Sequence, residues 1–168
     1  MADDAGVIAR QRLRAAMEAR DHAAVVSLFA PGVVVYSPII GRAAFRGRDS
    51  VADVYAAILE GFADFRYTRE MEGWDGEQLL GFEGTLRGTP LQGVDIIRVD
   101  DEGLIAEMTV MIRPLAGLIA FLVEIGPLIA RRGGRRHALA LRLVGPPLPL
   151  VARLVEWLSP RLVNLGRR

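Results

Sequence analysis

The spacing of apolar residues changes once along this chain, and the change limits the folds open to it. Up to residue 62 they recur every three or four positions, as Val51, Val54, Tyr55, Ile58, Leu59 and Phe62. This spacing predicts one long amphipathic helix. Beyond it they recur every second position, in the stretches 65–72, 79–87, 91–99 and 104–112, which predicts four strands. Helices followed by a run of strands indicate an α+β fold, with an antiparallel sheet curved around the long helix.

The residues before the long helix predict two more helices and a further strand. Residues 7–20 are rich in strong helix formers, and residues 22–30 form a second short segment that a Pro-Gly pair ends. Residues 33–37 (VVVYS) are mostly β-branched and predict a strand. We expect residues 1–6 to be disordered and residues 7–114 to form one domain.

The chain beyond this domain has a different composition. Residues 113–168 hold 10 of the 21 basic residues and only 2 of the 20 acidic ones, among long apolar segments. We expect a helical extension over 115–168. It would pack on the domain or across a homodimer, contact an anionic membrane surface as a peripheral element, or form a lid over a pocket. No apolar run reaches the roughly 20 residues that span a bilayer. Nucleic acid is not an expected partner, because aromatic residues do not alternate with the Arg pairs.

Several kinds of chemistry are excluded by what the sequence lacks. Cysteine is absent, and every basic residue is Arg, so disulfides, thiolate metal sites and lysine Schiff bases are ruled out. His22 and His137 are the only histidines, and neither has a partner at metal-ligand spacing. We find no phosphate loop, nucleophile elbow or dinucleotide fingerprint. We therefore expect no metal and no cofactor. The acidic N-terminus does not suggest a signal peptide. We expect a cytoplasmic location, with a location peripheral to a membrane as the alternative.

One charged residue stands where a carboxylate is costly. Asp95 lies inside the apolar run VDIIRV, and period two places it on the same sheet face as Ile97. One interpretation is an acid, base or hydrogen-bond donor in a pocket, with a raised pKa. The other is an edge-strand or interface residue paired with an Arg.

Three stretches together carry a family resemblance. They are the helix-strand segment SLFAPGVVVYSP, the helix entry GRAAFRGRDSVADVYAAIL and the final hairpin GVDIIRVDDEGLIAEMTVMIRP. This arrangement resembles the SnoaL-like branch of the nuclear transport factor two superfamily, which includes ketosteroid isomerases, limonene-epoxide hydrolases and polyketide cyclases. The resemblance implies a cone-shaped domain that encloses an apolar pocket, a hydrophobic small molecule as ligand, and a homodimer.

The resemblance carries over one catalytic role clearly. Asp95 matches the oxyanion-stabilising Asp of ketosteroid isomerases, which an apolar site keeps protonated. Ser37 stands at the position of their general base, and Ala16 falls near their tyrosine, so steroid isomerisation is not expected. The Arg and second Asp of limonene-epoxide hydrolases correspond to Gly93 and Val110. Polyketide cyclases keep an acid-base Asp and rely on pocket shape, which is compatible with Asp95 alone.

The resemblance and the period-two pattern together suggest which residues line the pocket. The proposed lining comprises Tyr55 from the long helix and, from the strands, Leu80, Phe82, Ile97, Met108, Val110 and Ile112. Trp74, in a hairpin turn, would cap the pocket mouth. Core packing is the alternative for all of them, because any half-buried sheet shows the same alternation.

Two functional hypotheses follow. The first is a cofactor-independent enzyme that acts on a hydrophobic small molecule by isomerisation, cyclisation or epoxide hydrolysis. Asp95 would be its principal acid, base or oxyanion donor, and Ser37 a secondary hydrogen-bond partner. The second is a non-catalytic binding protein that holds a lipid-like ligand or docks at a membrane surface through residues 115–168.

Overall fold

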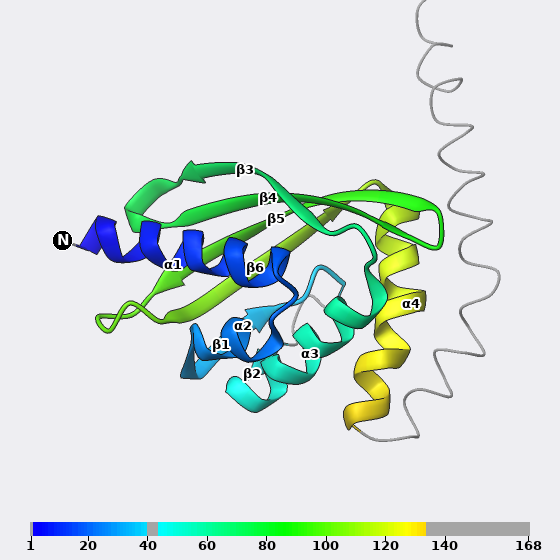
Figure 1. The fold of residues 1–168 in the computed structure, drawn as a ribbon, viewed down its shortest axis with the longest axis horizontal. Helices are drawn as coiled ribbons and strands as arrows, with labels where there is room; N and C mark the ends of the chain where they lie inside the picture. Colours follow the sequence, from blue (N-terminus) through cyan, green and yellow to red (C-terminus); the bar gives the residue numbers. More distant parts are fainter. Residues whose placement is uncertain (1, 40–43, 134–168) are drawn as a thin grey trace, which may run out of the picture.

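A computed structural model describes residues 2–39 and 44–133. The elements along the chain are α1 (Ala2–Glu18), α2 (His22–Ser27), β1 (Phe29–Tyr36), β2 (Ala44–Arg46), α3 (Arg48–Gly61), β3 (Arg66–Glu72), the 3-10 turn η1 (Trp74–Gly76), β4 (Gln78–Leu86), β5 (Thr89–Val99), β6 (Ile105–Arg113) and α4 (Leu115–Gly133). Helices α1 and α3 pack on one face of the sheet, and α4 crosses the end at which the β4–β5 turn lies (Figure 1). The predicted α+β fold is confirmed, and the predictions for residues 134–168 lie outside the described residues.

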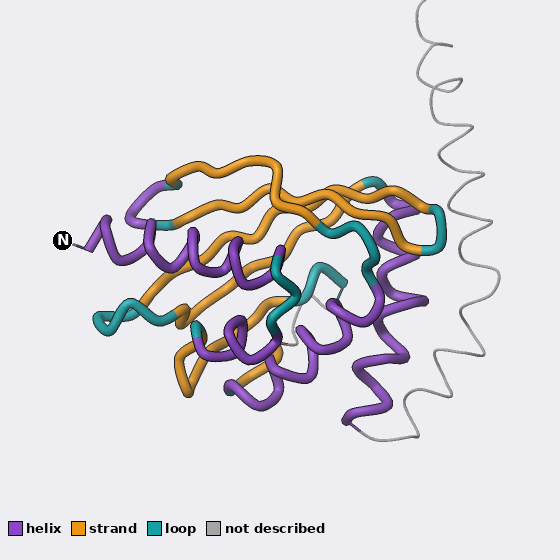
Figure 2. Tube along the Cα trace, viewed as in Figure 1, coloured by secondary structure: helices purple, strands orange, loops and turns teal. Residues whose placement is uncertain are grey.

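The sheet is mixed rather than purely antiparallel. Its strand order is β2-β1-β6-β5-β4-β3, and the β1–β6 pair is parallel. Tight connections join β3 to β6 in sequence, so these neighbours must run antiparallel. No such connection links β1 to β6, because α3 and four strands lie between them in the chain. The strands form one continuous curved layer (Figure 2).

The long helix α3 buries the stripe that its spacing predicted. Val51, Val54, Tyr55 and Leu59 are all buried. The helix begins at Arg48, and its N-cap residue is Gly47, which has no side chain to cap the helix. Asp49 instead places a carboxylate in the first turn, where the helix dipole favours negative charge.

Helix α1 begins at Ala2, within the segment 1–6 for which we expected disorder. Polar contacts hold this helix on the sheet. Arg10 Nη1 donates a 2.7 Å hydrogen bond to the buried side chain of Gln78 on β4. Arg10 and Arg14 also pair with Glu70 on β3, at 3.2 and 2.6 Å. Helix α1 therefore covers the half of the concave face near the β3–β4 turn.

Helix α4 packs closely against α3. Ile125 is fully buried, and a Cβ atom built at Gly61 of α3 would overlap its Cδ1 atom. Only glycine allows this approach of the two helices. Two ion pairs hold α4 as well, from Arg87 to Glu124 at 2.8 Å and from Arg131 to Glu60 at 3.1 Å. None of the helices described is long and apolar enough to span a membrane.

Candidate functional site

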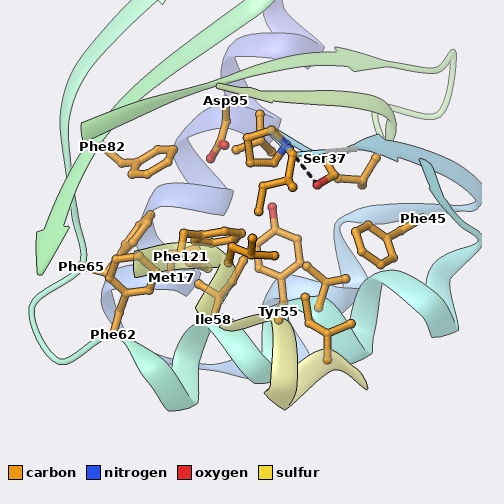
Figure 3. A pocket seen from close by; sticks show the side chains of 18 of the residues that line it. Met17, Ser37, Phe45, Tyr55, Ile58, Phe62, Phe65, Phe82, Asp95 and Phe121 are labelled. Atoms are coloured by element: carbon orange, nitrogen blue, oxygen red, sulfur yellow. Dashed lines mark hydrogen bonds between the residues drawn. The ribbon is translucent and has the colours of Figure 1, made fainter. Parts of the chain in front are cut away.

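A cavity of about 520 Å³ lies between the concave sheet face, α3 and α4. Its walls are almost entirely apolar, and aromatic rings gather on one side of it (Figure 3). Those rings belong to Phe62, Phe65, Tyr67, Phe82 and Phe121, and neighbouring centroids lie 5.0 to 6.5 Å apart. This size and lining are typical of a site for a hydrophobic small molecule.

Asp95 is the one carboxylic acid among the described residues that line the cavity. It sits in the middle of β5, in register with Leu80 on β4 and Val110 on β6, and its exposed fraction is 4%. Burial raises its pKa to about 7, although a hydrogen bond from Tyr67 acts in the opposite direction. At neutral pH the residue therefore populates both its acid and its base form, as a general acid-base group must.

Two tyrosines stand close to this acid. The Tyr67 hydroxyl donates a 2.8 Å hydrogen bond to Asp95 Oδ2, and the Tyr55 hydroxyl donates to Met108 Sδ at 3.0 Å. Burial raises the pKa of both phenols well above the ordinary value, and the charge of Asp95 raises them further. Both remain neutral donors at any physiological pH.

Ser37 completes the polar end of the cavity. It follows β1, and its Oγ accepts a 3.2 Å hydrogen bond from the backbone N–H of Ile39. A serine hydroxyl that accepts through its oxygen still has its own proton to donate. The oxygens of Asp95, Ser37 and Tyr55 point into the same part of the cavity from three different elements (Figure 3). The apolar cavity thus contains hydrogen-bonding groups from three separate parts of the chain.

Five of the residues proposed from sequence line the cavity. They are Asp95, Ser37, Tyr55, Phe82 and Val110. Phe82 comes close because β5 has a glycine beside it: a Cβ atom at Gly93 would overlap the Phe82 ring. The ring consequently lies close to the backbone of the strand that carries the acid.

The other five proposed residues lie outside the cavity lining. Leu80, Ile97 and Met108 are fully buried on the expected face, but they belong to the packed core. The reason is that α1 covers this half of the sheet, while Met108 lies behind Tyr55. Ile112 is half-buried against the core, and Trp74 is 89% exposed in the β3–β4 turn.

The cavity residues that were not predicted from sequence include Tyr67 and a group on α4. Tyr67 was identified as part of a strand but not as a partner of Asp95, because strand register cannot be derived from alternation alone. The group on α4 comprises Phe121, Leu122, Gly126, Ile129 and Ala130. Their helical spacing was visible, but nothing in the sequence indicated which surface this helix would cover.

No group of metal-ligating side chains is present in residues 2–39 and 44–133. His22, one of the two histidines, instead forms a 2.8 Å hydrogen bond with the carbonyl of Ala52 on α3. It therefore helps to join α2 to α3.

Comparison with known proteins identifies the family. A model of the SnoaL-like domain matches residues 10–108, which is more than half of the chain. This chain belongs to the SnoaL-like domain family. The resemblance inferred from sequence is thus confirmed, with the nuclear transport factor two-like fold that it implied. No curated protein sequence matches the chain.

Solved structures similar to this SnoaL-like protein include steroid-related proteins. A steroid delta-isomerase from Pseudomonas aeruginosa is 29% identical, with a TM-score of 0.66 over 76% of this chain and 90% of that one. An uncharacterised protein with a cystatin-like fold from Silicibacter pomeroyi is 26% identical, with a TM-score of 0.64 over 74% and 84%. The Mycobacterium tuberculosis protein RV0760c, in complex with estradiol-17beta-hemisuccinate, is 18% identical, with a TM-score of 0.53 over 66% and 98%. At that identity the last of these supports the fold alone.

Proposed function

We propose that this SnoaL-like protein is a cofactor-independent enzyme acting on a hydrophobic small molecule that carries one carbonyl or epoxide oxygen. The observation that carries the proposal is a nearly fully buried Asp95, with a pKa of about 7, at the polar end of an apolar cavity. Groups with such perturbed pKa values in a cavity are typical of acid-base catalysis. The similarity to a steroid delta-isomerase at 29% identity also supports a proposal of acid-base catalysis.

The arrangement favours isomerisation among the three reactions considered. A single carboxylate can take a proton from the carbon beside a carbonyl, hold it, and return it to another carbon of the same molecule. The enolate formed in between would receive hydrogen bonds from Ser37 and Tyr55. Tyr55 could reorient at little cost, because the thioether sulfur of Met108 is a weak acceptor. Epoxide hydrolysis asks for a second acid-base group to activate water, and the described lining has no second carboxylic acid.

The test is turnover of a panel of hydrophobic β,γ-unsaturated ketones, followed by the absorbance of the conjugated product. We expect activity in the wild type and loss of at least about 100-fold in Asp95→Asn, which is the usual contribution of a general acid-base group. Asp101→Asn, in the exposed β5–β6 turn, is the matched control and should keep full activity. If Asp95→Asn retains wild-type turnover, the proposed role of Asp95 is wrong.

The second candidate is a non-catalytic binding protein for a lipid-like ligand. It is favoured by Ser37, a residue that is no base, at the position that the family's isomerases use for one. Native mass spectrometry of the purified protein distinguishes the two functions. A co-purifying apolar molecule, together with no turnover of any ketone in the panel, would support the binding protein.

The homodimer and the membrane contact proposed for residues 115–168 have their own tests. The same native spectrum gives the oligomeric state directly. Co-sedimentation with anionic vesicles would compare the full chain with a chain ending at residue 133, which keeps α4. Equal partitioning of the two chains would exclude a membrane contact through the residues that follow α4.

A further inference from the structure

Tyr67 reaches Asp95 across an intervening strand. It lies on β3, in register with Phe82 on β4, and Phe82 is in register with Gly93 on β5. Asp95 is two residues further along β5, on the same face, so the Tyr67 side chain crosses the sheet diagonally. Its ring is 3% exposed and packs edge-on against Phe65 and Phe82, at centroid distances of 5.0 and 6.4 Å. These contacts fix the ring and leave only the hydroxyl to act on Asp95.

The hydrogen bond makes the two carboxyl oxygens of Asp95 unequal. Oδ2 accepts the Tyr67 proton at 2.8 Å, whereas Oδ1 has no hydrogen bond with any residue that the structure describes. Tyr67 is a donor whether Asp95 is charged or neutral, because the phenol stays protonated. The proton that Asp95 gains and loses is therefore carried on Oδ1.

We propose that Tyr67 is a positioning residue of this site, which holds Asp95 so that Oδ1 alone presents the exchangeable proton to the cavity. A role of Tyr67 in catalysis rests on the proposed function. The holding of the Asp95 carboxyl group by Tyr67 does not depend on it. Tyr67 need not touch the ligand. It acts by fixing the rotamer of the carboxyl group and by selecting which oxygen is available.

This role narrows the chemistry of the ligand. One available oxygen exchanges one proton, so Asp95 suits proton transfer at a carbon beside a lone carbonyl, whose own oxygen would accept hydrogen bonds from Ser37 and Tyr55. A guanidinium or an amide group would bind best to two carboxylate oxygens that are both available. A carboxylate ligand would be repelled by the charged form of Asp95. The expected ligand is therefore an apolar molecule whose polar group is a lone carbonyl oxygen.

The test is a pH titration of Asp95 in the ligand-free full-length protein, by NMR of aspartate labelled with ¹³C at Cγ. Asp95→Asn identifies the resonance. The wild-type midpoint should lie near 7. In Tyr67→Phe the midpoint should rise by about 1 pH unit, which matches the loss of a hydrogen bond to a charged group. Tyr55→Phe is the matched control, since that buried hydroxyl donates to Met108 and not to Asp95. Its midpoint should stay within about 0.3 pH units of the wild type, well below the effect of such a bond.

An unchanged midpoint in Tyr67→Phe, or an equal rise in both variants, would overturn the inference. A second measurement keeps the test open if Tyr67→Phe does not fold. Incorporation of 3,5-difluorotyrosine at position 67 keeps the ring and strengthens the donor, so the midpoint should fall. A midpoint that rises or stays fixed would again refute the role. Because the titration uses no ligand, its result is separate from the turnover test: an inactive Asp95→Asn with an unmoved Tyr67→Phe midpoint would reject only the positioning role.

Discussion

Burial of Asp95 should make this protein less stable as pH rises. The pKa of Asp95 is about 7 in the folded chain and 3.8 in the unfolded reference. Between these values the folded state binds the proton that the unfolded state has released. Stability falls with pH wherever the folded state holds more protons. The contribution of Asp95 to the free energy of unfolding should therefore decrease from about pH 4 to about pH 7 and stay constant above that.

The size of the effect follows from the two pKa values. One pH unit corresponds to about 1.4 kcal/mol, so the interval from 3.8 to about 7 is equivalent to about 4 kcal/mol. Between pH 4.5 and pH 8 the expected loss is about 3 kcal/mol, because the unfolded Asp is already partly ionised at the lower pH. Asparagine has nearly the same shape and no charge, and its side-chain oxygen can still accept from Tyr67. Asp95→Asn should therefore lack this pH dependence.

Urea unfolding of wild type and Asp95→Asn at pH 4.5 and pH 8 measures the effect. The quantity compared is the difference between the two proteins at each pH, in which the titration of all other groups cancels. Asp95→Asn should gain about 3 kcal/mol relative to wild type on going to pH 8. Asp101→Asn, an exposed residue of the β5–β6 turn, should follow the wild type. A constant difference between wild type and Asp95→Asn would show that the acid has an ordinary pKa and would refute the reasoning.

Two further predictions concern packing around the cavity. Gly93→Ala places a methyl group inside the Phe82 ring and should destabilise the fold by about 1–3 kcal/mol in urea unfolding. Gly32→Ala is the control, with nothing within 4 Å, and equal effects of the two would contradict the close approach. Ile125→Ala should destabilise by about 2–5 kcal/mol, because the side chain is fully buried between α3 and α4. A loss no larger than that of the half-buried Ile119→Ala would mean that α4 is not packed on α3 in solution.

The elements of this fold follow from local pattern, but their mutual placement does not. The stripe from Val51 to Leu59 defined α3, and alternation defined β3 to β6, because both signals are periodic and local. Strand β2 spans only Ala44–Arg46, too short for any period to be visible. The parallel β1–β6 pair depends on how α3 returns the chain to the sheet, which is a long-range property.

For the site, too, the sequence identified single residues but not how they are placed relative to one another. Asp95 was recognised because a carboxylate in an apolar strand conflicts with local rules, and such conflicts concentrate at functional sites. Leu80 and Ile97 were misplaced because period two identifies a face, but not which helix covers each half of it. Tyr67 was missed because its contact with Asp95 crosses two strand pairings, each with a register that alternation leaves undefined.

Helix α4 follows the part of the chain that holds the reactive groups of the cavity. The SnoaL-like match ends at residue 108, and it contains Asp95, Tyr67, Tyr55 and Ser37. Six lining residues lie beyond it, and five of them are on α4, which forms no part of the sheet. One wall of the cavity is thus encoded in a segment that contains none of its reactive groups. Substitutions in α4 can change which molecules fit while the acid and its hydrogen bonds stay intact, so ligand selectivity in this protein can be redesigned through one helix.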